Sequence, residues 1–265
     1  MPSLDLHWKF NNTLVDEEQG LTGTGYLFSY APGQVDRAIS LKELFSRVVI
    51  TPDSYINNMW NGGRTLMLWV KPTTGSETRL SLIEKSFDNG WSMPFGYIVS
   101  SKLDLQFIQQ FSISAGAWDT DTGLTIGSWN HVTLTYDSSS TGNDPQFYIN
   151  GSPITSTELV TPSGSPDNDT AYSIVIGGTS GSQNPDCLVD EVKIFTSALT
   201  DVEVQSEYLS YFTFNEGTRG TKDLRSDYPY ELGLTARTTR QTGKRFLYPT
   251  EKSLLKGFQR RKNGI

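Results

Sequence analysis

The 265-residue sequence is poor in the residue types that build many small folds and active sites. Its single cysteine, Cys187, excludes an intrachain disulfide and a cysteine-rich zinc site, and the strand-like residues after it indicate a buried thiol. The sequence has two histidines, His7 and His131, and no G-x-S-x-G, H-E-x-x-H or phosphate-loop motif. The common signatures of serine hydrolases, zinc peptidases and nucleotide-binding enzymes are therefore missing.

Long apolar runs are missing as well. No stretch approaches the roughly 18 apolar residues of a membrane span, and residues 1–20 lack the basic start and apolar centre of a signal peptide. We expect a chain made in the cytoplasm and without a membrane span. The composition, 36% hydrophobic and 12% aromatic, is sufficient for a substantial core and excludes a disordered chain.

Positive charge is scarce except near the C-terminus. Residues 233–265 carry nine basic residues and one acid, Glu251, a balance of +8, whereas the preceding residues carry 13 basic and 28 acidic residues, a balance of -15. We predict an acidic body followed by an extended basic arm over residues 235–265. The arm could dock on an acidic protein surface of a parent assembly or remain a solvated tail. Its sparse aromatics and scattered Arg and Lys disfavour nucleic acid as the partner.

Apolar residues recur with a period of two along most of the body, which is typical of β-strands. In residues 131–137, Val132, Leu134 and Tyr136 are predicted to face the core, and Asn150-Gly151 predicts a tight hairpin turn. The other predicted strands cover residues 4–10, 37–41, 64–72, 79–86, 95–100, 102–110, 146–154, 173–178 and 187–195. Thr200 and Glu203 form a capping-box pattern that predicts one short helix near residues 200–208.

Many short strands with few helices predict an all-β, two-sheet antiparallel jelly-roll sandwich. The sequence blocks LHWKF, RTLMLWVKPT, WNHVTLTYD, QFYINGSPI and CLVDEVKIFTSALTDVEV, in this order, resemble the laminin G-like jelly roll of the concanavalin A-like lectin/glucanase superfamily. The resemblance covers residues 1–210. Residues 211–234 resemble the start of the same fold again, as a vestigial repeat or as a strand that pairs within the chain or with a neighbouring subunit in a homo-oligomer.

The resemblance implies a ligand-binding face or loop rim and, in many members of the family, a bound calcium ion. Asp190 would then be a calcium ligand, with Asp16 as a possible second ligand, because calcium prefers hard oxygen donors. The alternative is that Asp190 accepts backbone N–H bonds or pairs with a cation where the sandwich closes. Which of the two roles Asp190 plays is left open at this stage.

Catalysis has little support in the sequence. The family's glucanases place their carboxylates on one strand as E-x-D-x-x-E, whereas here Val189 and Val192 interrupt that spacing, and the adjacent Asp190 and Glu191 are expected to point to opposite faces. His7 and His131 lie in strand-like segments and are predicted to be solvent-face or edge residues. We therefore expect no enzyme activity.

Binding is the remaining function. Trp60, Trp91 and Trp118 lie in Gly-, Asn- and Asp-rich surroundings, where they could be platforms for a sugar ring or, alternatively, plugs that pack into the core. Asp119 follows Trp118 and could bind the ligand or, together with Asp121, a cation.

The sequence thus predicts a non-enzymatic, lectin-like surface-binding component of a larger assembly, with a glycan or a host-surface protein as ligand. A lone domain without export signal or disulfides, carrying a basic tether, is typical of structural or decoration proteins of phage particles, so a virion is the predicted setting. The alternative function is a polysaccharide-active glycoside hydrolase or lyase of the same superfamily.

Overall fold

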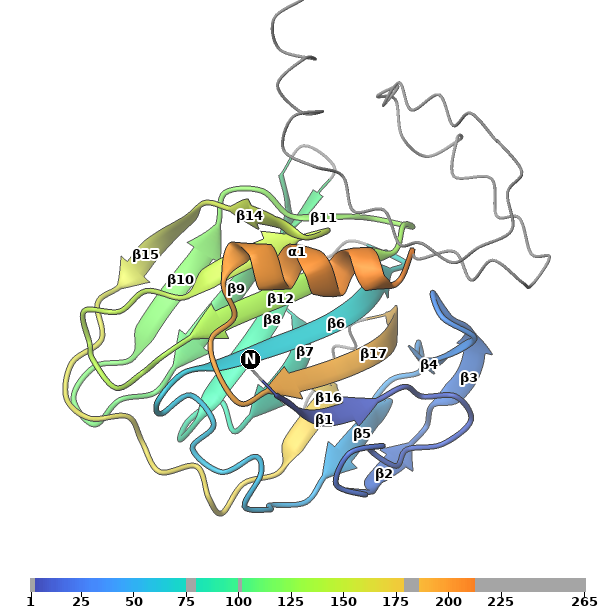
Figure 1. Cartoon of the computed structure of the whole chain (residues 1–265), viewed down its shortest axis with the longest axis horizontal. Coiled ribbons are helices and arrows are strands. Elements are labelled where there is room, and N and C mark those ends of the chain that lie inside the picture. Colours follow the sequence, from blue (N-terminus) through green and yellow to red (C-terminus); the bar gives the residue numbers. More distant parts are fainter. Residues whose placement is uncertain (1–2, 75–79, 100–101, 179–185, 213–265) are drawn as a thin grey trace, which may run out of the picture. The chain divides into compact units, whose positions relative to one another are not determined.

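The computed structural model describes residues 3–74, 80–99, 102–178 and 186–212. These residues form a sandwich of two antiparallel sheets, of eight and nine strands, and one helix (Figure 1). The predicted all-β jelly-roll architecture is confirmed.

The eight-stranded sheet has β6 and β17 at its centre. In spatial order it contains β14 (Ser152–Ile154), β13 (Gln146–Ile149), β12 (Asn130–Tyr136), β6 (Arg64–Pro72), β17 (Cys187–Phe195), β4 (Arg37–Leu41) and β3 (Ser29–Pro32), and β1 (Leu4–Trp8) also pairs with β17. Asn150 and Gly151, with φ of 52° and 74°, form the predicted turn between β13 and β14.

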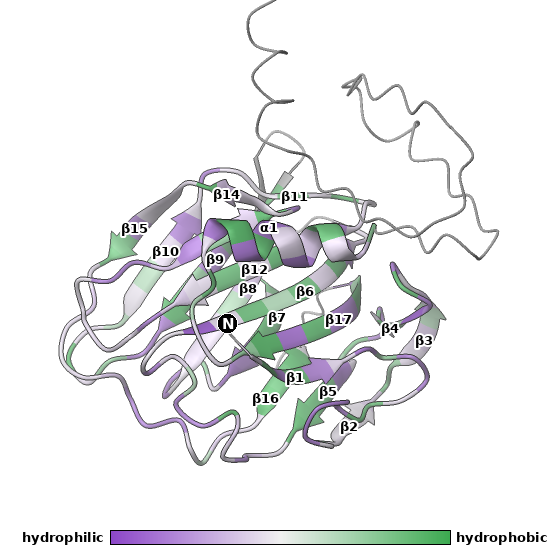
Figure 2. Ribbon diagram, in the orientation of Figure 1, coloured by the Kyte–Doolittle hydropathy of each residue, from purple (hydrophilic) through white to green (hydrophobic). Residues whose placement is uncertain are grey.

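The nine-stranded sheet is built around the meander β7–β8–β9–β10. In spatial order it contains β15 (Ser156–Val160), β10 (Gly116–Thr120), β9 (Lys102–Gln109), β8 (Trp91–Val99), β7 (Leu80–Lys85), β16 (Ile174–Gly177), β5 (Arg47–Ile50) and β2 (Gly23–Tyr26), and β11 (Leu124–Thr125) pairs with β9. The core lies between the two sheets. Val132, Leu134 and Tyr136 point into it, as their alternation predicts. Hydrophobic residues cover much of β5, β16 and β17, and hydrophilic residues interrupt them on β17 (Figure 2).

The acidic pair Asp190-Glu191 lies where β17 changes neighbours. One edge of β17 pairs with β4 as far as Val189 and with β1 from Val192 onward. Between these two pairings the register with β6 shifts, and Glu191 takes a positive φ of 50°. A β-bulge adds a residue to one strand, and this is why two adjacent acids fit inside an otherwise apolar strand.

Helix α1 (Asp201–Ser210) begins at the predicted capping box, in which the Thr200 hydroxyl accepts from the backbone N–H of Glu203 while the Glu203 carboxylate accepts from Thr200. The helix packs across the outer face of the eight-stranded sheet (Figure 1), where its buried residues Val204 and Tyr208 meet side chains of the sheet. Val204 contributes to a small cluster with Met67, Tyr148, Phe195 and Leu199.

The two histidines are buried. The prediction that they face solvent or lie at an edge is wrong for His131, whereas His7 lies on β1, which pairs with β17 alone among the described strands. His131 points outward from β12 but has no exposed surface, because its ring lies between Trp69 at 5.0 Å and Tyr208 of α1 at 5.6 Å. His7 Nε2 is 2.7 Å from Glu191 Oε2 across the β1–β17 pair. Alternation predicted the outward direction of His131 but not the helix that covers it.

Other sequence predictions fall at or beyond the limits of the described residues. Cys187 is buried, as predicted, and burial raises the pKa of its thiol. Tyr211 and Phe212 follow α1 as a turn, and the rest of the segment 211–234, together with the arm 235–265, lies outside the described residues. In the part of the chain that the structure describes, no helix has the length and apolar character to cross a bilayer.

Candidate ligand-binding face

The three tryptophans predicted as sugar platforms are core residues, and that prediction is wrong. Trp60, Trp91 and Trp118 are each at most 1% exposed. Trp60 packs edge-on against Trp91 with ring centroids 5.5 Å apart, and Trp118 stacks on Phe107 at 6.1 Å. Trp91 and Trp118 belong to strands β8 and β10, so their polar neighbours in sequence are outward strand residues and turns. The alternative interpretation, that the tryptophans plug the core, is the one that fits.

A buried cation explains how the loop around Trp60 is held. The ammonium of Lys85, at the end of β7, donates to Ile56 O at 2.7 Å, Asn57 Oδ1 at 3.1 Å and Asp169 Oδ1 at 2.9 Å. Burial lowers the pKa of Lys85, while the Asp169 carboxylate opposes this shift. These contacts hold the loop that contains Ile56 and Asn57 and the loop that contains Asp169 at the edge of the core, so this ion pair has a structural role.

Asp16 and Asp190, the predicted calcium ligands, have their own contacts. Asp16 is 1% exposed and accepts backbone N–H bonds from His7, Gln19 and Gly20. It thereby holds the turn after β1, and its role as a calcium ligand stays a prediction.

Asp190 has one oxygen engaged and one without a hydrogen bond. Its Oδ2 accepts from the backbone N–H of Val35 at 2.9 Å, and a Cβ on Gly33 would come within 2.5 Å of the same oxygen, so the loop 33–36 needs glycine there. Burial raises the pKa of Asp190 to about 7. Within the described residues no three or more His, Cys, Asp or Glu side chains group as metal ligands, and calcium binding at Asp190 stays a prediction.

The outer face of the nine-stranded sheet brings polar side chains together on neighbouring strands. On β8, Trp91 and Met93 belong to the core, so Ser92 between them points outward. Ser92 is paired directly with Glu84 of β7 on one side and with Ile108 of β9 on the other. Ile108 is in turn opposite Ala117 of β10. These residues form a row across four strands.

A second set lies further along the same face. Asp104 and Gln106 alternate with the core residues Leu103, Leu105 and Phe107 along β9 and are half-buried. Asp119 of β10 is the direct partner of Gln106, so it lies on this face too. Asp119 was predicted to bind ligand, and the structure places it among these side chains. We call this surface the β7–β10 face and define it by Glu84, Ser92, Asp104, Gln106, Ile108 and Asp119.

The β7–β10 face has the dimensions and chemistry of an oligosaccharide site. Four strands at the usual spacing span about 14 Å, and residues 104–108 extend about 13 Å along β9. Carboxylate, amide and hydroxyl groups surround the apolar Ile108 and Ala117, a combination suited to a sugar ring, which has an apolar face and a hydroxyl rim.

Ser92 carries the strongest indication of a ligand. It is 1% exposed, and its hydroxyl oxygen has no hydrogen-bond partner among the described residues. Its neighbour Glu84 is 7% exposed and accepts from the Ser81 hydroxyl at 2.7 Å. A buried polar group without a partner costs about 1–3 kcal/mol, which a ligand hydroxyl on this face could recover.

Sequence reasoning did not find Glu84, Ser92, Asp104 and Gln106 as candidates. The strands that contain them were predicted apart from the first residues of β8, and alternation would have assigned each residue to the outward side. The missing information was the strand order and register, which place four separate segments of the chain next to each other.

Comparisons with known proteins agree with this fold. The profile of the concanavalin A-like lectin/glucanases superfamily matches residues 46–205, more than half of the chain. Comparison with curated proteins finds no match.

Among solved structures, the binding domain of Paraclostridial Mosquitocidal Protein 1 is 18% identical with a TM-score of 0.64, and the match covers 80% of this chain and 53% of that one. The binding domain of botulinum neurotoxin serotype D is 18% identical with a TM-score of 0.60, covering 78% and 52%. The chain therefore spans about half the length of these two structures.

A third similar structure is nearly the size of the matched region. Domain 4 of AbnA, a GH43 extracellular arabinanase from Geobacillus stearothermophilus, was solved in complex with arabinotriose. It is 20% identical with a TM-score of 0.56, and the match covers 77% of this chain and 98% of that one. At these identities the three structures show the common fold.

Proposed function

Because the chain belongs to the concanavalin A-like lectin/glucanase superfamily, we propose that it is a lectin-like protein that binds a glycan on the β7–β10 face. The observation that carries this proposal is the buried, unpartnered hydroxyl of Ser92 on a sheet face that no described helix covers. The similar structures support it, since they include the binding domains of two toxins and an arabinanase domain in complex with arabinotriose.

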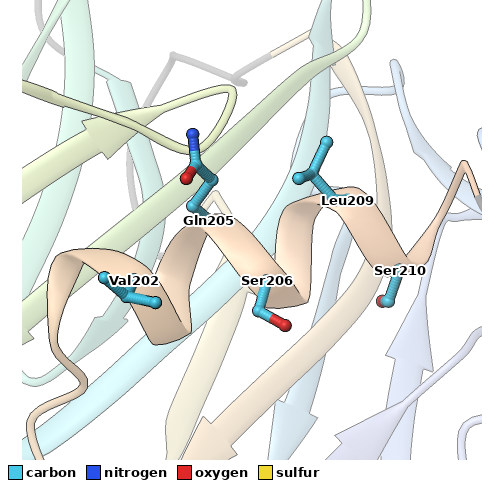
Figure 3. A pocket seen from close by; sticks show the side chains of 5 residues that line it. All are labelled: Val202, Gln205, Ser206, Leu209 and Ser210. Atoms are coloured by element: carbon cyan, nitrogen blue, oxygen red, sulfur yellow. The ribbon is translucent and has the colours of Figure 1, made fainter. Parts of the chain in front are cut away.

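The test compares a variant on the face with one elsewhere. Ser92→Ala removes the unpartnered hydroxyl without adding volume, and we expect it to weaken glycan binding about tenfold, the cost of one lost hydrogen bond of about 1.4 kcal/mol. The matched control is Ser206→Ala, which removes an exposed hydroxyl from the outward side of α1 (Figure 3). A glycan array identifies the ligand and calorimetry measures the affinities; equal binding by the two variants would remove Ser92 from the site.

Hydrolysis of a polysaccharide is a second candidate because Asp104 and Asp119 share one face of adjacent strands. Asp119 is opposite Gln106, and Asp104 is two residues from Gln106, so the two acids are diagonal neighbours, a relation that separates Cα atoms by about 7–8 Å. Inverting glycosidases hold their carboxyl groups about 6.5–9.5 Å apart. A reducing-sugar assay with Asp104→Asn and Asp119→Asn distinguishes the two functions, because only catalysis requires turnover.

Four further predictions concern the setting of the protein rather than the face. Calcium binding through Asp190, with Asp16 as a second ligand that also holds backbone N–H groups, stays a prediction. Anchoring by the arm 235–265 on an acidic protein surface, and formation of a homo-oligomer, also stay predictions. The same holds for a role in a phage particle, because the comparisons support binding and do not concern virions.

A further inference from the structure

Among the described strands, four end the two sheets, and one of these four lacks residues that block or weaken an edge. β14 contains Pro153, β3 ends at Pro32, and β2 contains Gly23 and Gly25. β15 (Ser156–Val160) reads STELV and has no proline, glycine or basic residue. Such residues protect an edge, because its unpaired backbone N–H and C=O groups otherwise accept a strand from another chain. β15 is therefore the terminal strand that is most open to an added partner.

The backbone of β15 pairs on one side only among the described residues. Asp121 N donates to Thr155 O at 3.0 Å just before the strand begins, so this carbonyl points towards the β10 side. Across a trans peptide bond the next N–H points the opposite way, so the N–H of Ser156 faces the side of β15 where the described sheet ends. A register shift near Val160 leaves residues 155–158 as the regular part of this edge. An added strand finds backbone partners there.

The side chains of β15 are exposed as well. Leu159 is 53% and Val160 is 45% exposed, and Thr157 and Glu158 are also exposed. Leucine, valine and threonine at an open edge give an added strand side chains to pack against. The edge therefore offers apolar contacts beside its backbone groups.

Carboxylates surround the β15 edge. Glu158 lies on the strand itself, and Asp121 accepts a hydrogen bond from the Thr157 hydroxyl at 3.1 Å. Burial raises the pKa of Tyr136 at the end of β12, and the negative charges of Asp144 and Glu158 raise it further, so these two acids lie on the same side of the sandwich. Three negative charges are thus placed near one strand edge.

The same segments contain no positively charged side chain. β10, β15 and the loops 121–123 and 137–145 have no Lys or Arg. Lys102 of β9 is four residues from Gln106, the partner of Asp119, so its backbone is about 13 Å further along a strand that β10 separates from β15. A segment that carries Lys or Arg therefore complements the edge in charge.

We propose that β15 binds an extended basic segment of a partner protein, which pairs with its free edge and extends the nine-stranded sheet. Backbone hydrogen bonds along residues 155–158 hold the segment, and Glu158 and Asp121 select Lys or Arg on it. The site is the edge of the sheet rather than the β7–β10 face, so it does not depend on the proposed binding of a glycan.

Synthetic peptides of defined charge test the edge. The probe is the capped heptapeptide TVKVKVT, and its two controls are TVEVEVT and a form of TVKVKVT that is N-methylated at each valine and lysine. Fluorescence anisotropy at low salt measures their affinities for the full-length protein. We expect TVKVKVT to bind, and both controls to bind at least about tenfold more weakly, because one repels the carboxylates and the other has lost the N–H groups of a ladder. Hydrogen exchange of residues 156–160 should slow when TVKVKVT binds.

Three variants locate the binding on β15. Ser156→Pro removes an N–H that points away from β10, so it should preserve the fold and weaken the binding of TVKVKVT at least about tenfold. Glu158→Lys should reverse the preference, so that TVEVEVT binds more tightly than TVKVKVT, and it keeps the test decisive if the proline variant unfolds. Glu18→Lys makes the same change of charge at an exposed position before β2 and should leave the preference unchanged.

The outcomes decide between strand addition and its alternatives. The proposal is wrong if TVKVKVT does not bind, if its N-methylated form binds as tightly, or if Glu18→Lys changes the preference as much as Glu158→Lys does, since the attraction would then belong to the whole acidic body. It is also wrong if the protein alone sediments as a dimer that Ser156→Pro dissociates, because a second copy then occupies the edge. Slower exchange at residues 156–160, together with a reversed preference in Glu158→Lys, would establish the added strand.

Discussion

The two outer faces of the sandwich are built from similar alternating strands, but a helix covers one of them and no described helix covers the other. On the eight-stranded sheet, Met67, Trp69 and His131 point outward and are buried because α1 and the turn after it lie over them. On the nine-stranded sheet, Asp104, Gln106 and Asp119 also point outward and remain half-buried. Alternation thus determines which side chains leave the core, whereas the element that packs over them decides whether they become a second core or remain half-buried.

The largest expected difference between the faces is in packing. Trp69 contacts His131, Tyr208, Tyr211 and Phe212, with ring centroids 5.0–6.2 Å away, so Trp69→Ala should lower the free energy of unfolding by about 3–5 kcal/mol. Gln106→Ala, at an outward position of the other sheet, should change it by about 0.5 kcal/mol or less. Urea unfolding measures both; similar losses would show that the β7–β10 face is packed as tightly as the covered one.

The second expected effect is a loss of protein stability at low pH, caused by His131 on the helix-covered face. Burial, with the nearby positive charge of Lys193, lowers the pKa of His131 to about 3 from its ordinary 6.5. As the pH falls from 6.5 towards 3, the unfolded chain takes up a proton that the folded protein does not, so stability decreases. His131→Phe should keep the ring contacts. Its free energy of unfolding, measured relative to that of the parent protein, should be about 2 kcal/mol higher at pH 5 than at pH 7. A pH-independent difference would contradict this account.

The third effect is a change of stability with pH in the opposite direction. Burial raises the pKa of Asp190 to about 7 from 3.8, so the folded protein holds a proton that the unfolded chain has lost between these values. Stability should therefore decrease as the pH rises from about 4 to about 7, by roughly 3 kcal/mol, and Asp190→Asn should remove that decrease.

The same measurement tests calcium. With a chelator present, the pH dependence of unfolding should be as described, and excess calcium should leave it unchanged if Asp190 binds no metal. If calcium abolishes the pH dependence in the parent protein and has no effect on Asp190→Asn, the ion binds at Asp190.

The smallest effect concerns the first turn of helix α1, which lies over the eight-stranded sheet. Thr200→Ala removes the hydroxyl that caps α1, and we expect it to cost about 1 kcal/mol. Because Val204 and Tyr208 hold the helix on the sheet, the loss should appear as faster hydrogen exchange in α1, with the β7–β10 strands unchanged. Equal increases in both regions would mean that the helix and the nine-stranded sheet unfold together.

Local signals in the sequence predicted the parts of the fold that depend on neighbouring residues. The turn at Asn150-Gly151, the capping box of Thr200 and the inward side of β12 each rest on a few adjacent positions, and all are confirmed. The tryptophans and His131 were misassigned because their burial depends on segments far away in the sequence. Trp60 is enclosed by strands β8 and β9 and by Tyr136 of β12, and His131 by a helix about 75 residues later.

The candidate face shows the same limit. Asp119 was proposed from its surroundings in sequence, but its partners Gln106 and Asp104 become neighbours only through the register of β9 and β10. The search for catalytic pairs considered acids within one strand, and a pair divided between adjacent strands has no fixed spacing in the sequence.

The pairing of β1 with β17 joins the first strand that is synthesised to the last one that the structure describes. Ser3 and Thr196, hydrogen-bonded at this pair, are 193 positions apart, so β1 is made long before its partner. At 5–20 residues per second, β1 leaves the ribosome roughly 10–40 s before β17 does. During that interval Leu6 and Trp8 lack the strand beside which they are buried. A nascent chain halted before residue 187 therefore holds an unpaired first strand, a form that chaperones and proteases recognise.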